Sequence, residues 1–219
     1  MLPVPPEGYA GTERVVATLI EELYARGHDV TLYGSGDSKV SGRLVAVVPE
    51  SLWSRGYRGD VSAFMALSVA RIWRDHDQFD IIHAHTETQG FLFARHCPTP
   101  VITTLHGRLD SSGVPALLEE FTDIPLVSIS ESQRRWGPEA NWVATIHHGL
   151  ELASMPFSER TGEYLALIGR VTPEKGVAEA IELAEMTDLP LKIGAKVYDA
   201  QEKAYYKEVV VPAVQAGGV

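Results

Sequence analysis

Hydrophobic positions along the chain follow two alternating spacings, which predict helices and strands in turn. Over residues 13–27, apolar side chains recur every three or four positions, the spacing of a helix with one buried face. Thr12 stands where a residue caps the start of a helix, and Gly27 where glycine commonly ends one. Helical spacing recurs at 61–76, and a further helix is predicted at 88–97.

Short runs that are apolar almost throughout predict strands between these helices. They lie at residues 28–34, 43–48, 79–85, 100–107, 125–132 and 141–149. Strands that are apolar on both faces are typical of parallel sheets covered by helices on each side. The alternation therefore predicts an α/β fold, with a doubly wound parallel sheet over residues 1–150.

The pattern breaks over residues 151–162, which are polar and contain Pro156 and Gly162, so we expect a linker between domains there. Strand and helix alternation then restarts, and we expect an incomplete second doubly wound domain over 163–219. Its predicted elements are strands at 164–171 and 189–197 and helices at 176–186 and 201–218. The N-terminus also looks clipped, because the glycine loop of such sheets usually follows a first strand.

Composition narrows the class of protein. The 219 residues include 19 Lys and Arg against 29 Asp and Glu, a formal net charge of −10. Such a chain is a poor general binder of nucleic acid or anionic membrane. Cys97 is the single cysteine, which excludes an internal disulfide. No apolar run reaches the ~20 residues that cross a bilayer, and no signal-peptide pattern opens the chain, so we expect a cytoplasmic protein.

Two cations stand beside the predicted helix start in the second domain. A helix N-terminus is electrically positive and favours acidic side chains, yet Arg170 and Lys175 both lie next to it. An ordinary start explains Thr172 as a cap, Pro173 in the first turn and Glu174 against the dipole. It leaves the cations unexplained, whereas a phosphate held between them and the helix N–H groups would explain both.

The loop before the first predicted helix carries a weaker signal of the same kind. Gly8 and Gly11 would let the backbone come close to a ligand, and free N–H groups suit a phosphate or a sugar hydroxyl. A plain turn followed by a capped helix explains the same residues equally well.

Histidines follow or end several predicted strands. They are His83, His85, His106, His147 and His148. Ligands of doubly wound sheets bind beyond the carboxyl ends of the strands, which is where these residues lie. His106, followed by Gly107, is the first candidate for substrate contact, and His85 is the second. A metal held by His83 and His85 is an alternative, although no third, acidic ligand is evident nearby.

Taken together, these segments resemble family 4 glycosyltransferases, which have the two-domain GT-B fold. The matching segments, in the family's order, are residues 8–38, 79–85, 100–110, 125–134, 141–150 and 167–184. The resemblance implies two Rossmann-like domains that transfer a sugar from a nucleotide-diphosphate donor to an acceptor. It also implies retention of configuration and no metal or other cofactor. The first domain would hold the acceptor and the second most of the donor.

The resemblance also implies roles for particular residues. Arg170 and Lys175 would bind the donor diphosphate and stabilise the charge on the departing nucleotide. Gly11 would approach the donor phosphates or the acceptor, and His106 would contact the transferred sugar. The residues expected to contact the acceptor or the sugar are Thr12, His85 and Arg108.

The chain departs from the family by ending before a second-domain glutamate motif, E-x7-E, and by the absence of a first strand. We therefore expect a fragment or a short relative that transfers sugar poorly or not at all. A non-catalytic module that binds a nucleotide or sugar phosphate is the main alternative. Others are a metallohydrolase built on His83, His85 and His106, and a subunit completed by a second copy or a partner chain.

Overall fold

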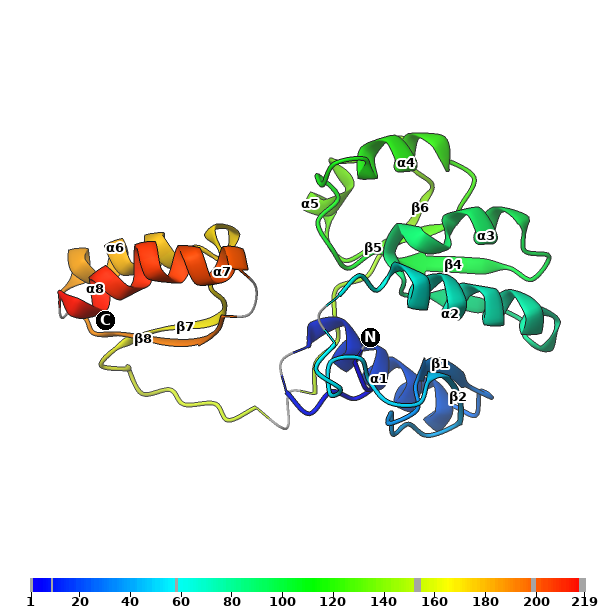
Figure 1. Ribbon diagram of the computed structural model, residues 1–219, viewed down its shortest axis with the longest axis horizontal. Coiled ribbons are helices and arrows are strands. Elements are labelled where there is room, and N and C mark those ends of the chain that lie inside the picture. The colour runs from blue at the N-terminus through cyan, green and yellow to red at the C-terminus, as the bar shows by residue number, and fades with distance from the viewer. Residues whose placement is uncertain (1, 9, 58, 152–154, 198–199, 217–219) are drawn as a thin grey trace. The chain divides into compact units, whose positions relative to one another are not determined.

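The computed structural model describes residues 2–8, 10–57, 59–151, 155–197 and 200–216. The chain forms two compact units, Met1–Met155 and Pro156–Val219, each with its own hydrophobic core (Figure 1). The division falls within the segment 151–162, where the hydrophobic pattern breaks. Residues 152–154 of that segment and 217–218 of the last predicted helix lie outside the described residues.

Helix α1, Gly11–Ala25, opens the regular structure of the first unit. It begins one residue before Thr12, so the predicted cap by Thr12 is wrong. The N-cap position is held by Ala10, which supplies no side-chain hydrogen bond. The predicted end is confirmed, because Gly27 has φ +87° and donates its N–H to the Tyr24 carbonyl at 2.9 Å. Residues 2–8 contain no strand.

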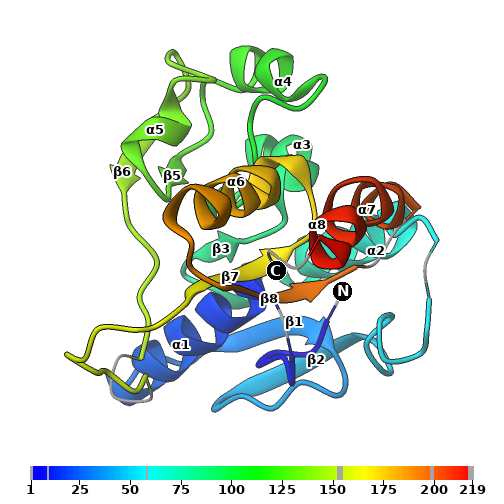
Figure 2. The ribbon, with the colours of Figure 1, turned by 90° about the vertical axis from the view of Figure 1, so that its left-hand side faces the viewer.

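Strands β1, Thr31–Ser35, and β2, Arg43–Val48, form a parallel pair beside α1 (Figure 2). The apolar face of α1 covers them, with Val16 and Ile20 packed near the partly buried Leu32. Helix α2, Ser62–Asp75, follows and contacts both strands. The predicted strand at 43–48 and helix at 61–76 are therefore confirmed.

A second parallel sheet of the first unit has the strand order β3-β4-β5-β6. Its strands are β3, Ile82–Ala84, β4, Val101–Thr104, β5, Leu126–Ser128, and β6, Trp142–Thr145. The helical elements around it are η1, His76–Gln78, η2, Glu87–Gly90, α3, Phe91–His96, α4, Val114–Glu120, and α5, Glu131–Arg134. Among the residues described, no ladder joins this sheet to β1 and β2.

The main core of this sheet is a cluster of buried apolar side chains. Phe91 of α3, Leu118 of α4 and Leu126 of β5 are each at most 1% exposed. Burial of such side chains stabilises a fold by about 1.5–3 kcal/mol each. This packing fixes the ends of β3, β4 and β6 at one edge, where the histidines lie.

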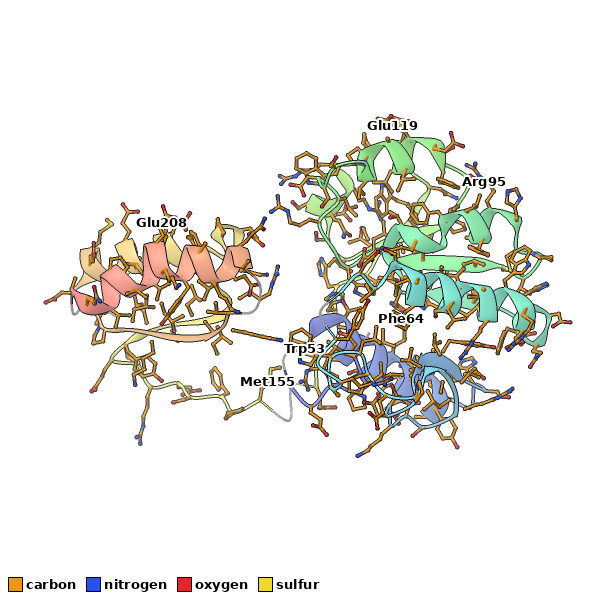
Figure 3. All side chains as sticks on the ribbon, in the orientation of Figure 1. Trp53, Phe64, Arg95, Glu119, Met155 and Glu208 are labelled. Atoms are coloured by element: carbon orange, nitrogen blue, oxygen red, sulfur yellow. The ribbon has the colours of Figure 1, made fainter. Side chains whose placement is uncertain are left out.

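The second unit contains a two-stranded parallel sheet with helices on one face (Figures 1 and 2). Its elements are β7, Leu165–Arg170, η4, Pro173–Lys175, α6, Val177–Thr187, β8, Leu191–Lys196, α7, Ala200–Tyr205, the π-helical η5, Tyr206–Val210, and α8, Val211–Gln215. Ile168, on the other face of the sheet, is 84% exposed. Glu208 points outward from the helical layer (Figure 3).

Both units have the parallel α/β architecture that the sequence predicts. No helix among the described residues is long and apolar enough to cross a bilayer.

Candidate functional site

Three histidines from separate strands meet at the carboxyl edge of the four-stranded sheet. His85 follows β3, His106 lies two residues beyond β4, and His148 lies three residues beyond β6. Because these strands are parallel, their carboxyl ends share one edge. The structure thus places the predicted site residues His85 and His106 together and adds His148.

The three imidazoles form a row, called the histidine row below. Nδ1 of His85 lies 2.8 Å from Nε2 of His106, and Nδ1 of His106 lies 3.5 Å from Nε2 of His148. Ring centroids are 5.1 Å apart at both steps. His83 lies beside the row, with its ring 4.2 Å from that of His85 and its Nε2 hydrogen-bonded to Thr104 Oγ1 at 2.8 Å.

Burial favours the neutral form of the inner rings. Desolvation, together with the charges that neighbouring imidazoles would carry, lowers the pKa of His85 to about 3. Desolvation and the same repulsion lower the pKa of His106 to about 4. His148 is exposed, and partial desolvation lowers its pKa less. The inner part of the row is therefore uncharged near neutral pH.

Glu87 forms hydrogen bonds with the backbone of the histidine row at His106. Its two carboxylate oxygens accept the His106 backbone N–H at 3.1 and 3.2 Å. Burial raises the pKa of this carboxyl group, while the N–H groups of Gly107 and His106 oppose the rise. Glu87 has φ +52°, a conformation that is uncommon outside glycine. Sequence reasoning missed this residue, although its place two residues after His85 put it at the predicted ligand edge.

The row lacks the geometry of a metal centre. The nitrogens of His85, His106 and His148 are directed at one another in a line, whereas metal ligands converge on a point. Within the described part of the chain, no group of three or more His, Cys, Asp or Glu residues is placed to hold a metal ion.

The other predicted residues of the first unit lie apart from the row. Arg108 forms a bidentate pair with Asp110, with Nε to Oδ1 at 2.9 Å and Nη2 to Oδ2 at 2.5 Å. Gly11 and Thr12 occupy the first turn of α1. No heavy atom lies within 4 Å of a Cβ built on Gly11, so this helix start is open. In the described part of the unit, neither Gly11 nor Thr12 forms a hydrogen bond with the histidine row.

The second unit holds the predicted cations in a loop at the carboxyl end of β7, called the cation loop below and comprising Arg170–Gly176. Nη1 of Arg170 lies 3.1 Å from Oε1 of Glu202, and its Nη2 lies 3.3 Å from Oε1 of Glu174. Glu202 is only 2% exposed. Sequence reasoning missed Glu202, because nothing in the polar start of the last helix marks one glutamate as buried.

The helix start differs from the prediction. Pro173–Lys175 form a separate 3₁₀ turn, and Gly176, with φ +70°, joins that turn to α6. Thr172 gives no side-chain cap, so the predicted cap is wrong, and its buried hydroxyl has no hydrogen-bond partner among the described residues. Exposed Lys175 forms no salt bridge within the described second unit.

The positive charge of the cation loop is balanced by Glu174 within the loop and by Glu202 on α7. The charges of Arg170 and Lys175 are formally offset by those of Glu174 and Glu202. Lys175 is nevertheless exposed and stands two residues before the start of the 11-residue α6, a combination that favours an anion.

Three comparisons with known proteins bear on the family and the fold. A model of Glycosyltransferase Family 4 matches residues 9–167. The crystal structure of AviGT4, a glycosyltransferase involved in Avilamycin A biosynthesis, matches with a TM-score of 0.64 and 22% identity, over 98% of this chain and 56% of that one. Acinetobacter baumannii MurG matches with a TM-score of 0.40 and 15% identity, over 95% of this chain and 64% of that one.

This chain therefore spans about half the length of AviGT4 and shares its fold. A search of curated protein sequences finds no significant match.

Proposed function

We propose that this chain, which belongs to glycosyltransferase family 4, binds a nucleotide-diphosphate sugar and takes part in transferring the sugar to an acceptor. The observation that carries the proposal is the cation loop, where exposed Lys175 and half-buried Arg170, at the end of β7, flank the start of a 3₁₀ turn that leads into α6. The family match ends at residue 167, before this loop, so the geometry of the loop is separate support.

The diphosphate would bind by exchange at Arg170. The Arg170–Glu174 pair leaves 42% and 35% of the two side chains exposed, and such pairs contribute only about 0–1 kcal/mol. A phosphate oxygen can replace Glu174 at Nη2 at little cost. Nη1 would keep its bond to Glu202, so the guanidinium would stay oriented during the exchange.

Lys175 and the first N–H groups of α6 would supply the remaining contacts. The opening N–H groups of a helix have no intrahelical partner and point out of its end. As the glycosidic bond to the donor breaks, charge grows on the departing diphosphate, and these groups would stabilise it. We propose that the transfer needs neither a metal nor another cofactor, because the cation pair would fill that electrostatic role. Retention of configuration is proposed from the family resemblance.

The first unit would supply contacts to the sugar and the acceptor. We propose that the His106 ring contacts the transferred sugar, and its neutral form suits hydrogen bonding with hydroxyls. The open start of α1 at Gly11 and Thr12 and the exposed Arg108 are proposed as further contacts.

Calorimetric titration with UDP and with GDP tests donor binding. We expect the chain to bind at least one of them, and Lys175→Gln or Arg170→Gln to weaken binding about tenfold or more, since a charged hydrogen bond contributes about 1.5–3 kcal/mol. Lys207→Gln removes the same charge from an exposed position on η5 and should change affinity less than about twofold. The proposal would be refuted if the chain bound neither UDP nor GDP. It would also be refuted if all three variants lost the same affinity.

Transfer itself needs a separate assay with a panel of nucleotide sugars. Nucleotide binding without release of nucleoside diphosphate from any donor would favour a non-catalytic binding module.

A further inference from the structure

Both ring nitrogens of His106 are occupied by other histidines. Nε2 faces Nδ1 of His85 at 2.8 Å, and Nδ1 faces Nε2 of His148 at 3.5 Å. A neutral imidazole carries one N–H and one lone pair. His106 therefore donates to one neighbour and accepts from the other.

This constraint couples the three rings. If His85 donates to His106, then His106 donates to His148, and if His106 donates to His85, then His148 donates to His106. Only these two proton orders keep both hydrogen bonds with neutral rings. The partner of one nitrogen of His106 thus decides whether its other nitrogen is a donor or an acceptor.

The two contacts are unequal. The contact to His85 has the length of a good hydrogen bond, and His85 is half-buried at the end of β3. The contact to His148 is at the upper limit of length, and His148 is exposed on the loop after β6. A ligand can therefore displace His148 more easily than His85.

The surroundings keep His106 in place for this arrangement. Glu87 holds the His106 backbone N–H with both carboxylate oxygens. His83 lies against His85 but directs its Nε2 to Thr104. Among the described residues, the titratable groups that contact the inner rings or their backbone are Glu87, His83 and the members of the row themselves.

We propose that His85 is a positioning residue that fixes which nitrogen of His106 carries the proton, and that His148 yields its place at Nδ1 to a sugar hydroxyl. The second half rests on the proposed function. His85 then sets the hydrogen-bonding role that His106 presents to the sugar without touching the sugar itself.

The first test measures the proton positions directly. Long-range ¹H–¹⁵N correlation spectra distinguish a protonated imidazole nitrogen from one with a lone pair. An asparagine amide stands near the position of Nδ1, whereas a glutamine amide reaches toward that of Nε2. We expect His85→Asn to preserve the ¹⁵N shifts of His106, and His85→Gln to move both toward the average of an unconstrained ring.

Two further variants serve as controls in the same spectra. His148→Ala and the neighbouring His147→Ala should leave the protonation of His106 Nε2 unchanged. If Asn and Gln at position 85 give the same His106 spectrum, or if His148→Ala moves it as much as His85→Gln does, the positioning role is wrong. Asn and Gln are both polar, so the comparison does not depend on a variant that loses its fold.

The second test concerns the sugar. The ratio of affinities for a nucleotide sugar and its nucleoside diphosphate isolates the sugar's contribution. We expect His85→Gln to reduce this ratio about tenfold, as expected for one lost hydrogen bond of about 1.4 kcal/mol, and His85→Asn to restore it. Affinity for the diphosphate alone should stay unchanged in both variants, because the cation loop is intact.

The two proposals can fail separately. If the wild-type chain binds no nucleotide, donor binding is refuted, and the spectra still decide the role of His85. If the wild type favours the nucleotide sugar and His85→Gln leaves the ratio unchanged, the positioning role is refuted while donor binding stands.

Discussion

Acid should destabilise the first unit through the inner rings of the histidine row. The pKa of His85 is about 3 in the folded chain against an ordinary value of 6.5. Between these values the unfolded chain binds a proton and the folded chain does not. The stability contributed by the neutral ring is therefore complete above pH 6.5 and is lost as the pH falls toward 3. The same sign applies to His106, whose pKa is about 4.

The expected loss follows from the pH window. When the pH is lowered from about 7.5 to about 5, it ends roughly 1.5 units below the pKa of a histidine in the unfolded chain. At 1.36 kcal/mol per unit, protonation then stabilises the unfolded chain by about 2 kcal/mol. This figure does not depend on how far below 5 the folded pKa lies. Since the inner rings are only half-buried, we halve it and expect about 1 kcal/mol from each ring, about 2 kcal/mol in all.

Urea unfolding followed by tryptophan fluorescence measures this loss in the first unit alone. All 4 tryptophans of the chain lie in it, at positions 53, 73, 136 and 142. His85→Asn removes one titrating ring but keeps a polar side chain near Nδ1, so the loss between about pH 7.5 and about 5 should shrink by about 1 kcal/mol.

Glu87 acts in the opposite direction and is unchanged by that substitution. Burial raises its pKa, so the folded chain binds this proton more readily, and its contribution to stability grows as the pH falls. Comparing the two proteins at each pH removes this contribution. An equal loss in wild type and His85→Asn would refute the assignment of acid sensitivity to the histidine row.

Two predictions concern glycines. Gly137→Ala should destabilise the first unit by about 1–3 kcal/mol in urea unfolding, because its Cβ would lie 2.6 Å from Leu118 Cδ1. Gly149→Ala is the control, because its Cβ would meet no heavy atom within 4 Å. An equal effect of the two substitutions would contradict the packing argument. Gly176→Ala should destabilise the second unit by about 1–2 kcal/mol in thermal unfolding, because φ there is +70°. Gly176→Asn should cost less, since asparagine tolerates this conformation, and equal costs would point to a cause other than backbone strain.

Local pattern was enough to predict most of the elements. The strand at 43–48 is found with its predicted bounds, because its run of apolar residues rich in Val suits a parallel strand. The expectation of a parallel sheet also predicted correctly that the histidines would lie at one edge. The resemblance to family 4 glycosyltransferases is confirmed by the match over residues 9–167. Helix α4, Val114–Glu120, was missed, because two turns are too short for a clear helical period.

The contacts that define the site depended on tertiary structure. Thr12 and Thr172 are suitable capping residues by type, yet α1 begins before Thr12, and Thr172 precedes only a 3₁₀ turn, to which its side chain gives no capping hydrogen bond. Arg170 was predicted as a cation available to a ligand, and the fold pairs it with Glu174 and with buried Glu202. A sequence pattern shows that a residue can bond, but only packing decides which partner comes within reach.

The backbone at Glu87 has a consequence for directed evolution of this chain. Its left-handed φ of +52° would suit glycine or asparagine better, and a glutamate there costs roughly 1–2 kcal/mol. Glycine or asparagine at this position would relieve the strain, but it would also remove the carboxylate that accepts the amide of His106. Position 87 is therefore where backbone conformation and hydrogen bonding favour different amino acids, so selection for heat tolerance would meet a trade-off there.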